Sequence, residues 1–203
     1  EITLFTSGTG SGKSTVIKEI ILDLLNKTND KIGLISLEES IGDTAEKFIS
    51  MQLRKSVYNP DNVTEEESRQ AFDKVFGSER LILLDHAGSV SDSSLIEKIE
   101  YMALGLISHL RKAQGGTRSF EEGKLASIDD IKGSGSIKQI SFDIVSFARN
   151  LVAEEESERN VIKFRVLKSR FTGLTGNAGS ANYDRGTGRL RATGGFDFDL
   201  IGE

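Results

Sequence analysis

The chain has 203 residues, a net charge of -5, no cysteine and a single proline. This composition excludes disulfides and any cysteine-ligated zinc site, and its acidic balance excludes a generally basic nucleic-acid-binding surface. Its apolar runs are far too short to cross a bilayer and no signal peptide opens it, so we expect a soluble, cytoplasmic protein without a membrane partner. Because the first strand is already under way at Glu1, we interpret the chain as part of a longer protein.

The first predicted elements are a strand at Ile2 to Thr6, a glycine-rich loop and a helix with apolar residues at helical spacing. The loop reads Ser7-Gly8-Thr9-Gly10-Ser11-Gly12-Lys13-Ser14-Thr15. This order is the context that identifies a Walker A phosphate-binding loop, although Ser7 stands where the motif normally has glycine. Lys13 would reach the β- and γ-phosphates, and Ser14 would hold Mg²⁺. The sequence therefore predicts that the chain binds a nucleoside triphosphate.

The next apolar run, Lys31 to Leu37, predicts a buried parallel strand that ends in Glu38-Glu39-Ser40. Ligands of open α/β sheets lie at the carboxyl ends of strands, so a carboxylate here would face the nucleotide. A general base that takes a proton from the attacking water belongs at this place. The alternative is a solvated acid that caps the following helix, and spacing alone does not choose between them.

Two helices at 43–55 and 65–76 are predicted next, followed by a strand from Leu81 to His86 and a helix from Asp92 to Leu104. Four apolar residues followed by Asp85 have the form of a Walker B strand, whose carboxylate orients Mg²⁺. Taken alone, Asp85 is the candidate for this role.

A short strand at Gly105 to Arg111 ends near His109, which is either a functional residue or an ordinary histidine at a strand edge. The polar, glycine-rich stretch from Lys112 to Ala126 is expected to be a mobile loop. A second glycine-serine turn then opens a helix, and the residues concerned are Lys132, Gly133, Ser134, Gly135 and Lys138. Small residues between two lysines suit a nucleic-acid phosphate, but a glycine-serine turn is often only a turn.

Strands at Phe142 to Ala148 and Asn160 to Leu167 follow, separated by an acidic turn. Lys168 and Arg170 continue the parity of the apolar face of the second strand, so we expect both to project past the sheet end, into solvent or toward a phosphate on a neighbouring subunit. We then predict a loop at Thr172 to Ser180, a hairpin turn at Tyr183 to Leu190 and a disordered acidic tail from Gly194.

These residues resemble the helicase half of phage helicase-primases and, more distantly, Twinkle and the DnaB-like replicative helicases. The blocks that carry the resemblance occur in order and span nearly the whole chain; they are Thr6 to Thr15, Leu37 to Ser40, Ile107 to Arg111, Ile131 to Gln139, Ala148 to Asn150 and Leu167 to Gly173. The resemblance implies an α/β fold, a RecA-like P-loop NTPase core with a mostly parallel sheet flanked by helices, over residues 1–190. It also implies a homo-hexameric or heptameric ring that uses ATP or dTTP with Mg²⁺ to move 5′ to 3′ on single-stranded DNA.

The resemblance assigns roles to individual residues. Glu38 corresponds to the base that activates water, and Arg170, with Lys168 beside it, corresponds to an arginine finger that acts on the adjacent subunit. His109 is similar to the residue that senses the γ-phosphate, with Gln139 assisting. Arg149 and Tyr183 resemble the pair that sandwiches the nucleotide base, and Lys132 with the Gly133-Ser134-Gly135 backbone falls on the loop that grips DNA.

The pattern breaks at one point. The family has a strand with the Walker B aspartate, a loop and a helix between Gly105 and the strand that holds His109, amounting to about 40 residues. Here Gly105 runs directly into Leu106. The strand that ends at Asp85 aligns with the one before the missing segment, so the resemblance gives Asp85 no Walker B role. Because every other motif is intact, we expect the segment to be omitted from this sequence rather than deleted from the protein.

Two other functions share parts of this pattern. A RecA-type recombination ATPase has the same core but should lack the Leu167 to Gly173 block, and a non-hydrolysing nucleotide-dependent DNA-binding module is compatible with the missing segment. The acidic tail, residues 191–203, is a candidate contact for a basic partner such as the replicative polymerase, although a disordered end without a role explains it equally well.

Overall fold

The computed structural model describes residues 2–36, 39–59, 61–84, 104–109, 119–131 and 135–193. The chain divides into two compact units. The first unit comprises Glu1–Lys13, Leu104–Tyr183 and Leu190–Glu203, and the second comprises Ser14–Ala103 and Asp184–Arg189. In the described parts of both units, no helix has the length and apolar character needed to span a membrane.

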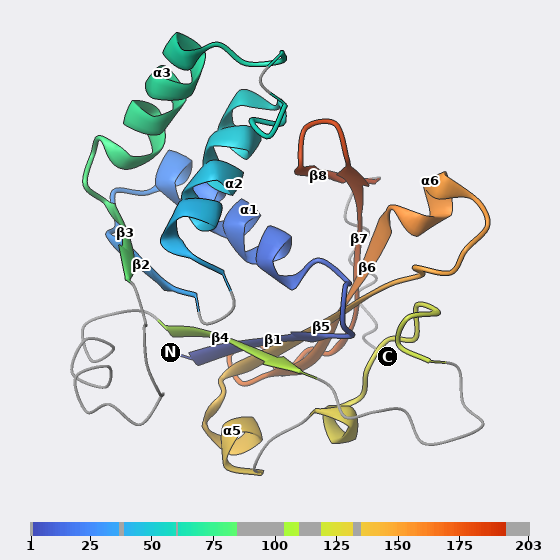
Figure 1. Cartoon of the computed structure of the whole chain (residues 1–203). Coiled ribbons are helices and arrows are strands. Elements are labelled where there is room, and N and C mark those ends of the chain that lie inside the picture. The colour runs from blue at the N-terminus through green and yellow to red at the C-terminus, as the bar shows by residue number, and fades with distance from the viewer. Residues whose placement is uncertain are drawn as a thin grey trace. The chain divides into compact units, whose positions relative to one another are not determined.

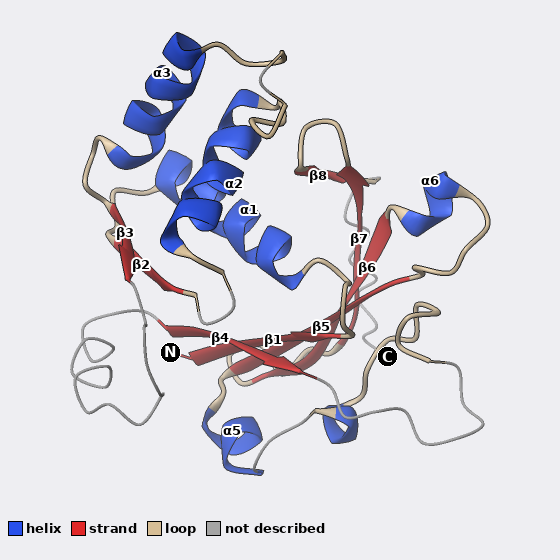
Figure 2. Cartoon of the chain, viewed as in Figure 1, coloured by secondary structure: helices blue, strands red, loops and turns tan. Residues whose placement is uncertain are grey.

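A six-stranded sheet dominates the first unit (Figures 1 and 2). Its strand order is β4-β1-β5-β6-β7-β8, and the strands are β1 (Ile2–Ser7), β4 (Leu104–His109), β5 (Asp143–Arg149), β6 (Val161–Ser169), β7 (Gly176–Asp184) and β8 (Arg189–Ala192). The central strand β1 runs parallel to both β4 and β5. Beyond β5 the direction alternates, because β5 and β6, and then β6 and β7, pair antiparallel.

The prediction of a mostly parallel sheet is therefore wrong, because the main sheet is mixed and its larger part is antiparallel. The connections explain the difference. A parallel crossover needs a dozen or more residues, usually including a helix, whereas antiparallel strands can be joined by short turns. The links after β5 are short: the β5–β6 link holds only the four-residue helix α6 (Glu156–Arg159), β6 and β7 are joined by a loop, and β7 and β8 by a tight turn.

Apolar residues of β1 and β5 form the core of the first unit. Leu4 and Ile144 are both 0% exposed and pack with Ile131, which lies between the short 3₁₀ helix Ile128–Asp130 and the helix α5 (Gly135–Ile140). The prediction that a glycine-serine turn opens a helix is confirmed, since α5 begins at Gly135. This packing holds the segment before α5 against the same two strands that position the glycine-rich loop.

The second unit combines α1 (Lys13–Lys27), α2 (Ile41–Leu53) and α3 (Glu65–Phe76) with a two-stranded parallel sheet. The sheet pairs β2 (Ile32–Ile35) with β3 (Leu81–Leu84), as Figure 1 shows. The helices bury one shared cluster, whose members are Ile21, Leu22, Phe48, Met51, Val75 and Leu81. The two helices predicted at 43–55 and 65–76 are confirmed, because their apolar spacing matches the face that they bury.

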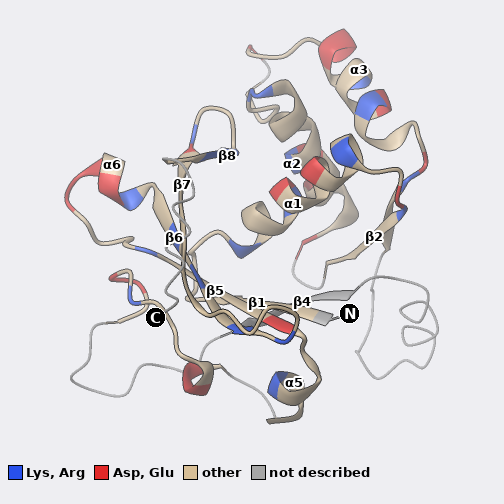
Figure 3. Cartoon of the chain, turned by 180° about the vertical axis from the view of Figure 1, so that it is seen from behind, with Lys and Arg blue, Asp and Glu red and all other residues tan. Residues whose placement is uncertain are grey.

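Polar caps fix where these helices begin. The Ser40 hydroxyl accepts a hydrogen bond from the Asp43 backbone amide at the start of α2. At the start of α3, Thr64 and Glu67 form a reciprocal capping box, and acidic residues fill the first turn (Figure 3). Carboxylates there also complement the positive end of the helix dipole.

The loop predicted at Thr172 to Ser180 is only partly a loop, because β7 begins at Gly176. Its sequence, Gly-Asn-Ala-Gly-Ser-Ala-Asn, lacks the alternation of apolar side chains that signals a strand, and Ala181 is its one buried residue. Backbone pairing with β6 makes it a strand instead. The predicted hairpin turn near the end is confirmed, with residues 185–188 between β7 and β8.

Some predictions fall outside the described residues. They are the end of the strand at Asp85 and His86, nearly all of the helix predicted from Asp92, the first part of the loop after His109, and the acidic tail from Gly194. At the suspected missing segment, Gly105 and Leu106 are consecutive residues of β4.

Candidate nucleotide-binding site

The loop between β1 and α1 adopts a conformation that only glycines make easy. Gly10 and Gly12 have φ angles of 73° and 93°, in the left-handed region that side chains disfavour. Gly8 is needed for a different reason, since a Cβ on it would lie 2.8 Å from the Cβ of Phe120. The glycine positions of the Walker A prediction therefore have a physical explanation in the folded loop.

Polar groups of the loop contact one another. The Nζ of Lys13 donates to the backbone oxygens of Gly8 at 3.0 Å and Ser7 at 3.4 Å. The hydroxyl of Ser11 is buried, and among the described residues it has no hydrogen-bond partner. A phosphate entering the loop would exchange these carbonyl contacts of Lys13 for a charge-assisted bond.

Strand register brings further predicted site residues to the same edge of the sheet. His109, the last residue of β4, is the register partner of Ser7, where the glycine-rich loop begins. On the other side, β5 pairs Ser146 with Thr6 and continues to Arg149 beyond the end of β1. The carboxyl ends of β1, β4 and β5 thus form one edge, which is where ligands bind in α/β sheets.

Arg149 and Tyr183, predicted to sandwich the base, contact each other directly. The guanidinium carbon of Arg149 lies 5.1 Å from the ring centroid of Tyr183. Arg149 is 9% exposed and also donates to the backbone oxygen of Arg159 and, at 2.7 Å, to Oδ1 of Asn160. A base can enter between the two side chains only after they separate.

The acidic turn after β2 contains two neighbouring glutamates. Glu38, the predicted base, lies outside the described residues. Glu39 is described, and its carboxylate forms ion pairs with Lys18 of α1 at 2.7 Å and Lys47 of α2 at 2.8 Å. Burial raises the pKa of Glu39, but the hydrogen bonds from the two lysines outweigh it and lower that pKa to about 2. A carboxylate held this acidic is a poor proton acceptor near neutral pH.

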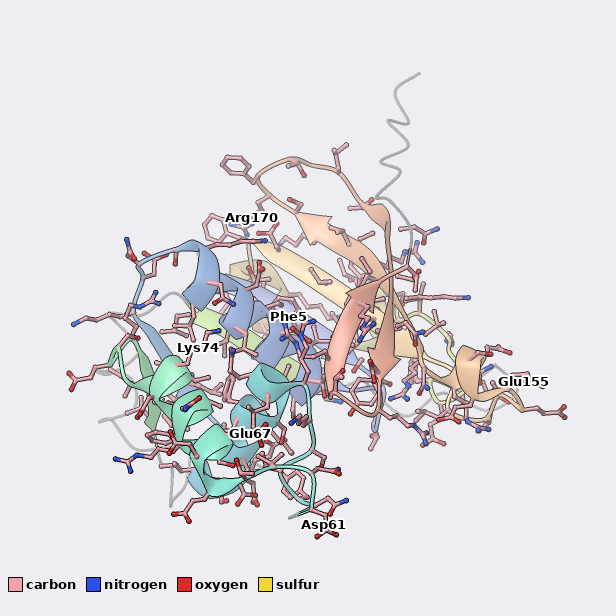
Figure 4. The ribbon with its side chains drawn as sticks, turned by 90° about the horizontal axis from the view of Figure 1, so that it is seen from above. Phe5, Asp61, Glu67, Lys74, Glu155 and Arg170 are labelled. Atoms are coloured by element: carbon pink, nitrogen blue, oxygen red, sulfur yellow. The ribbon has the colours of Figure 1, made fainter. Side chains whose placement is uncertain are left out.

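The predicted finger residues Lys168 and Arg170 contact the end of α5 (Figure 4 labels Arg170). Lys168 donates 2.6 Å hydrogen bonds to the backbone oxygens of Lys138 and Ser141, and Arg170 donates to that of Gln139. Burial and the neighbouring Arg170 charge lower the pKa of Lys168. The expected projection of both side chains past the sheet is not observed.

A β-bulge explains the altered direction. Ile144 pairs with Lys168 while Val145 pairs with Val166, so Leu167 is an extra residue on β6. A bulge of this kind reverses the alternation of side chains beyond it. Leu167 consequently packs against the core of the first unit, and the alternation that ends at Val166 does not extend to Arg170.

The predicted DNA-contacting loop is described only in part. Lys132, Gly133 and Ser134 lie outside the described residues, whereas Gly135 begins α5. Lys138, on the same helix, has its Nζ 3.9 Å from Oδ1 of Asp129. Gln139 and Lys138 also present the carbonyls that Lys168 contacts.

The described residues supply little protein ligation for a metal ion. They contain no cluster of three or more His, Cys, Asp or Glu side chains that could hold one. Ser14 lies in the first turn of α1, where its hydroxyl suits one position of a magnesium shell. Because Mg²⁺ is usually held by a few protein oxygens together with substrate phosphates and waters, this arrangement fits a nucleotide-bound ion.

Sequence reasoning missed three features of this region. Phe120, 8% exposed, packs against Gly8 from within a stretch predicted as a mobile loop, and its only signal was an aromatic residue amid polar ones. Lys18 is one of several charged residues on a helix, without a sign in the sequence that it is buried. The α5 carbonyls that hold Lys168 are backbone groups, which no side-chain pattern reveals.

Comparison with known proteins gives these features a context. No known family profile matches the chain. The chain is 28% identical over 241 residues to the DNA helicase/primase of Enterobacteria phage T3, an alignment that covers 94% of the chain and 42% of the relative. The chain thus spans less than half of that relative's length.

Solved structures share the fold. An ATPase domain of a DnaB-like helicase matches with a TM-score of 0.70 and 14% identity, covering 95% of this chain and 84% of that one. A DnaB-like replicative helicase, solved in a study of its interactions with primase, matches with a TM-score of 0.72 and 13% identity, covering 96% of this chain and 57% of that one. The chain is a homologue of the phage T3 DNA helicase/primase and has the fold of DnaB-like helicase ATPase domains.

Proposed function

We propose that the chain is the motor domain of a ring-forming replicative DNA helicase, which couples hydrolysis of ATP or dTTP to 5′ to 3′ movement on single-stranded DNA. The observation that carries the proposal is the edge formed by β1, β4 and β5. It combines a glycine-rich loop, Lys13 at the start of α1 and the His109 backbone level with Ser7. Homology to the T3 DNA helicase/primase supports a motor that acts on DNA.

In the proposed reaction, Lys13 holds the β- and γ-phosphates and Ser14 holds Mg²⁺, which neutralises charge on the transferred phosphoryl group. Glu38 takes the proton from the attacking water. His109 senses the γ-phosphate and, with Gln139, relays its presence to the DNA-contacting residues Lys132 to Lys138.

The position of Arg170 supports action on a neighbouring subunit. Its backbone amide donates to the Phe142 oxygen at 2.9 Å, at the end of β5 that is level with Thr3. The glycine-rich loop begins after Ser7, roughly 13 Å further along β1 at the usual rise per residue. An arginine side chain does not span that distance, so Arg170 can serve a phosphate only in another copy of the chain. A hexameric or heptameric ring provides that copy, and small loops around its centre would supply positive charge that the acidic chain otherwise lacks.

We also propose that the chain lacks a segment of its parent protein between Gly105 and Leu106. The T3 alignment extends over 241 residues although the chain has 203, so the relative carries residues that have no counterpart here. The family resemblance assigns such residues to this junction, as a segment with the Walker B aspartate. Its absence favours a second candidate function, a module that binds nucleotide and DNA without hydrolysis.

The test is nucleotide hydrolysis with and without polydeoxynucleotide, by the chain and by a restored version that carries the T3 residues at this junction. Hydrolysis that rises with DNA, in either form, supports the motor. Binding of nucleotide without hydrolysis in both forms would favour the binding module instead. Size measurement with nucleotide and DNA present should report six or seven copies, and a monomer under these conditions would contradict the ring.

A further inference from the structure

We propose that Glu39 is a positioning residue, whose buried ion pair with Lys18 ties the helix that follows the phosphate-binding loop to the turn that carries Glu38. The inference rests on the proposed function, in which Glu38 activates water. It assigns no proton transfer to Glu39 itself. It makes the placement of the base depend on a contact between α1 and the turn after β2.

The Lys18 side chain is the first half of the contact. It lies on α1 four residues after Ser14, which is about one helical turn, and it is only 5% exposed. Its Nζ is 2.7 Å from Oε2 of Glu39. Burying an ammonium group is costly unless an opposite charge compensates it, so removal of either partner leaves the other in an unfavourable place.

The second half is the turn itself. The backbone amide of Glu39 donates to the Ser36 hydroxyl at 3.2 Å, and the next residue, Ser40, caps α2 through the Asp43 amide at 3.0 Å. Ser36 and Glu39 are therefore held on either side of Glu38 in the sequence. The Glu39 side chain then connects this turn to α1.

Lys47 provides an internal comparison, because it contacts the other oxygen of the same carboxylate at 2.8 Å. It belongs to α2, directly after the turn, and its side chain is 41% exposed. Exposed ion pairs contribute little, typically 0 to about 1 kcal/mol. Lys47 therefore shares the charge and the partner of Lys18 but does not connect the turn to the phosphate-binding helix.

The connection gives nucleotide binding a route to the catalytic base. Phosphates held at the start of α1 fix that helix, and the Lys18–Glu39 pair holds the turn in register with it. Hydrolysis needs the base within hydrogen-bonding distance of the water, and a displacement of about 1 Å costs as much as 10²-fold in rate. Loss of the pair should therefore lower turnover while leaving phosphate binding largely intact.

The experiment compares Lys18→Met with Lys47→Met in the form of the protein that hydrolyses nucleotide. Each substitution removes one positive charge from the same carboxylate. We expect Lys18→Met to lower kcat by about 10- to 100-fold with KM for nucleotide nearly unchanged, and Lys47→Met to stay within about twofold of the parent. Lys18→Arg, which keeps the charge, should restore most of the turnover. Equal losses in the two methionine variants, or no loss in a folded Lys18→Met, would overturn the inference.

A second readout does not require hydrolysis. Amide hydrogen exchange with a non-hydrolysable nucleotide should show protection of both the glycine-rich loop and residues 36–40 in the parent chain. In Lys18→Met the loop should stay protected while residues 36–40 lose nucleotide-dependent protection. Protection of both segments in the variant contradicts the positioning role.

Glu39→Gln extends the test to the other partner and keeps the shape of the side chain if Lys18→Met does not fold. It should reproduce the fall in kcat, and the double variant should lose little more than either single one, because both remove the same contact. Independent, multiplying losses would overturn the inference. The motor proposal fails separately, on absence of hydrolysis in the parent and restored forms, whereas the inference fails on the variants and on exchange at residues 36–40.

Discussion

The parallel strands β1 and β5 of the main sheet and the parallel strands β2 and β3 of the small sheet have similar apolar sequences but different surroundings. Leu4 of β1 and Ile144 of β5 are fully buried. All four residues of β2 are half-buried, and Ile82 of β3 is 48% exposed. Parallel strands normally have both faces covered, and their continuous apolar sequence reflects that. The small sheet thus has the composition of an inner sheet and the exposure of an edge.

The composition of a strand therefore records the surroundings in which it evolved. The main sheet satisfies its composition with residues of the first unit alone, since Ile131 and Ile137 of α5 pack against it. The small sheet does not, and the proposed missing strand and helix supply a reason, in keeping with the longer T3 alignment. Four experiments test this contrast, and they are given in descending order of the effect that we expect.

Arg170→Ala should have the greatest effect, because it removes the contribution of the main sheet to the neighbouring site. We expect hydrolysis to fall by about 10³-fold or more, as for other arginine fingers, with nucleotide binding and ring size unchanged. Steady-state turnover and nucleotide titration measure this. Arg165→Ala is the matched control, because Arg165 is an exposed arginine on the same strand. A wild-type rate in Arg170→Ala would show that Arg170 is not a finger.

Substitutions in the cores should separate the two sheets by stability. We expect Ile144→Ala to lower the free energy of unfolding by about 2–5 kcal/mol, because it leaves a cavity in a filled core. Ile82→Ala should cost less than about 1 kcal/mol, because nearly half of that side chain is already in solvent. Urea unfolding of both variants measures the difference. Equal costs would show that the small sheet is as well covered as the main one.

Restoring the T3 residues at the Gly105–Leu106 junction should change the small sheet alone. If the restored strand covers that sheet, Ile82→Ala in the restored version should cost about 1 kcal/mol more than in the present chain, through the additional area buried. The cost of Ile144→Ala should not change, which makes it the internal control. An unchanged cost of Ile82→Ala would place the restored strand elsewhere.

The weakest effect concerns acid stability of the second unit. The pKa of Glu39 is about 2 in the folded chain, against an ordinary value of 4.5. Since the folded pKa is the lower one, the carboxylate stabilises the fold above pH 4.5, and this contribution is lost as the pH falls toward 2. Glu39→Gln should therefore flatten the dependence of unfolding free energy on pH in this window.

Glu67 offers a control for that titration, because its exposed pair with Lys55 also lowers its pKa to about 2. Added salt should weaken the Glu67 contribution and leave most of the Glu39 contribution, since buried pairs are screened less. A Glu39→Gln variant with the parent's pH dependence would contradict the buried pair.

The sequence was sufficient where one local rule governed an element. The glycine-rich loop, α1 and the capped helices α2 and α3 follow from motif and apolar spacing, and His109 was expected at the nucleotide edge because parallel strands end together. Strand direction beyond β5 was not predictable in the same way, since the family resemblance suggested a parallel sheet and the short connections were given less weight. The strand β7 was missed because its glycine, serine and asparagine residues pair only through the backbone.

The site was predicted less completely than the fold. Neighbouring Glu38 and Glu39 are alike in sequence, and only the burial of Lys18 shows that Glu39 has a partner of its own. The direction of Lys168 depends on a one-residue bulge at Leu167, which periodicity cannot detect in advance. Contacts that depend on which residue is buried, or on where a ladder slips, need the folded chain.

A mixing experiment asks directly whether a neighbouring copy completes the site. Arg170→Ala and Glu38→Gln should each be inactive alone, whereas an equal mixture, allowed to assemble with nucleotide and polydeoxynucleotide, should recover turnover at seams where an intact arginine meets an intact glutamate. For random assembly this amounts to roughly a quarter of the seams. Recovered hydrolysis is the result that a shared site predicts. A mixture no more active than its two components would contradict it.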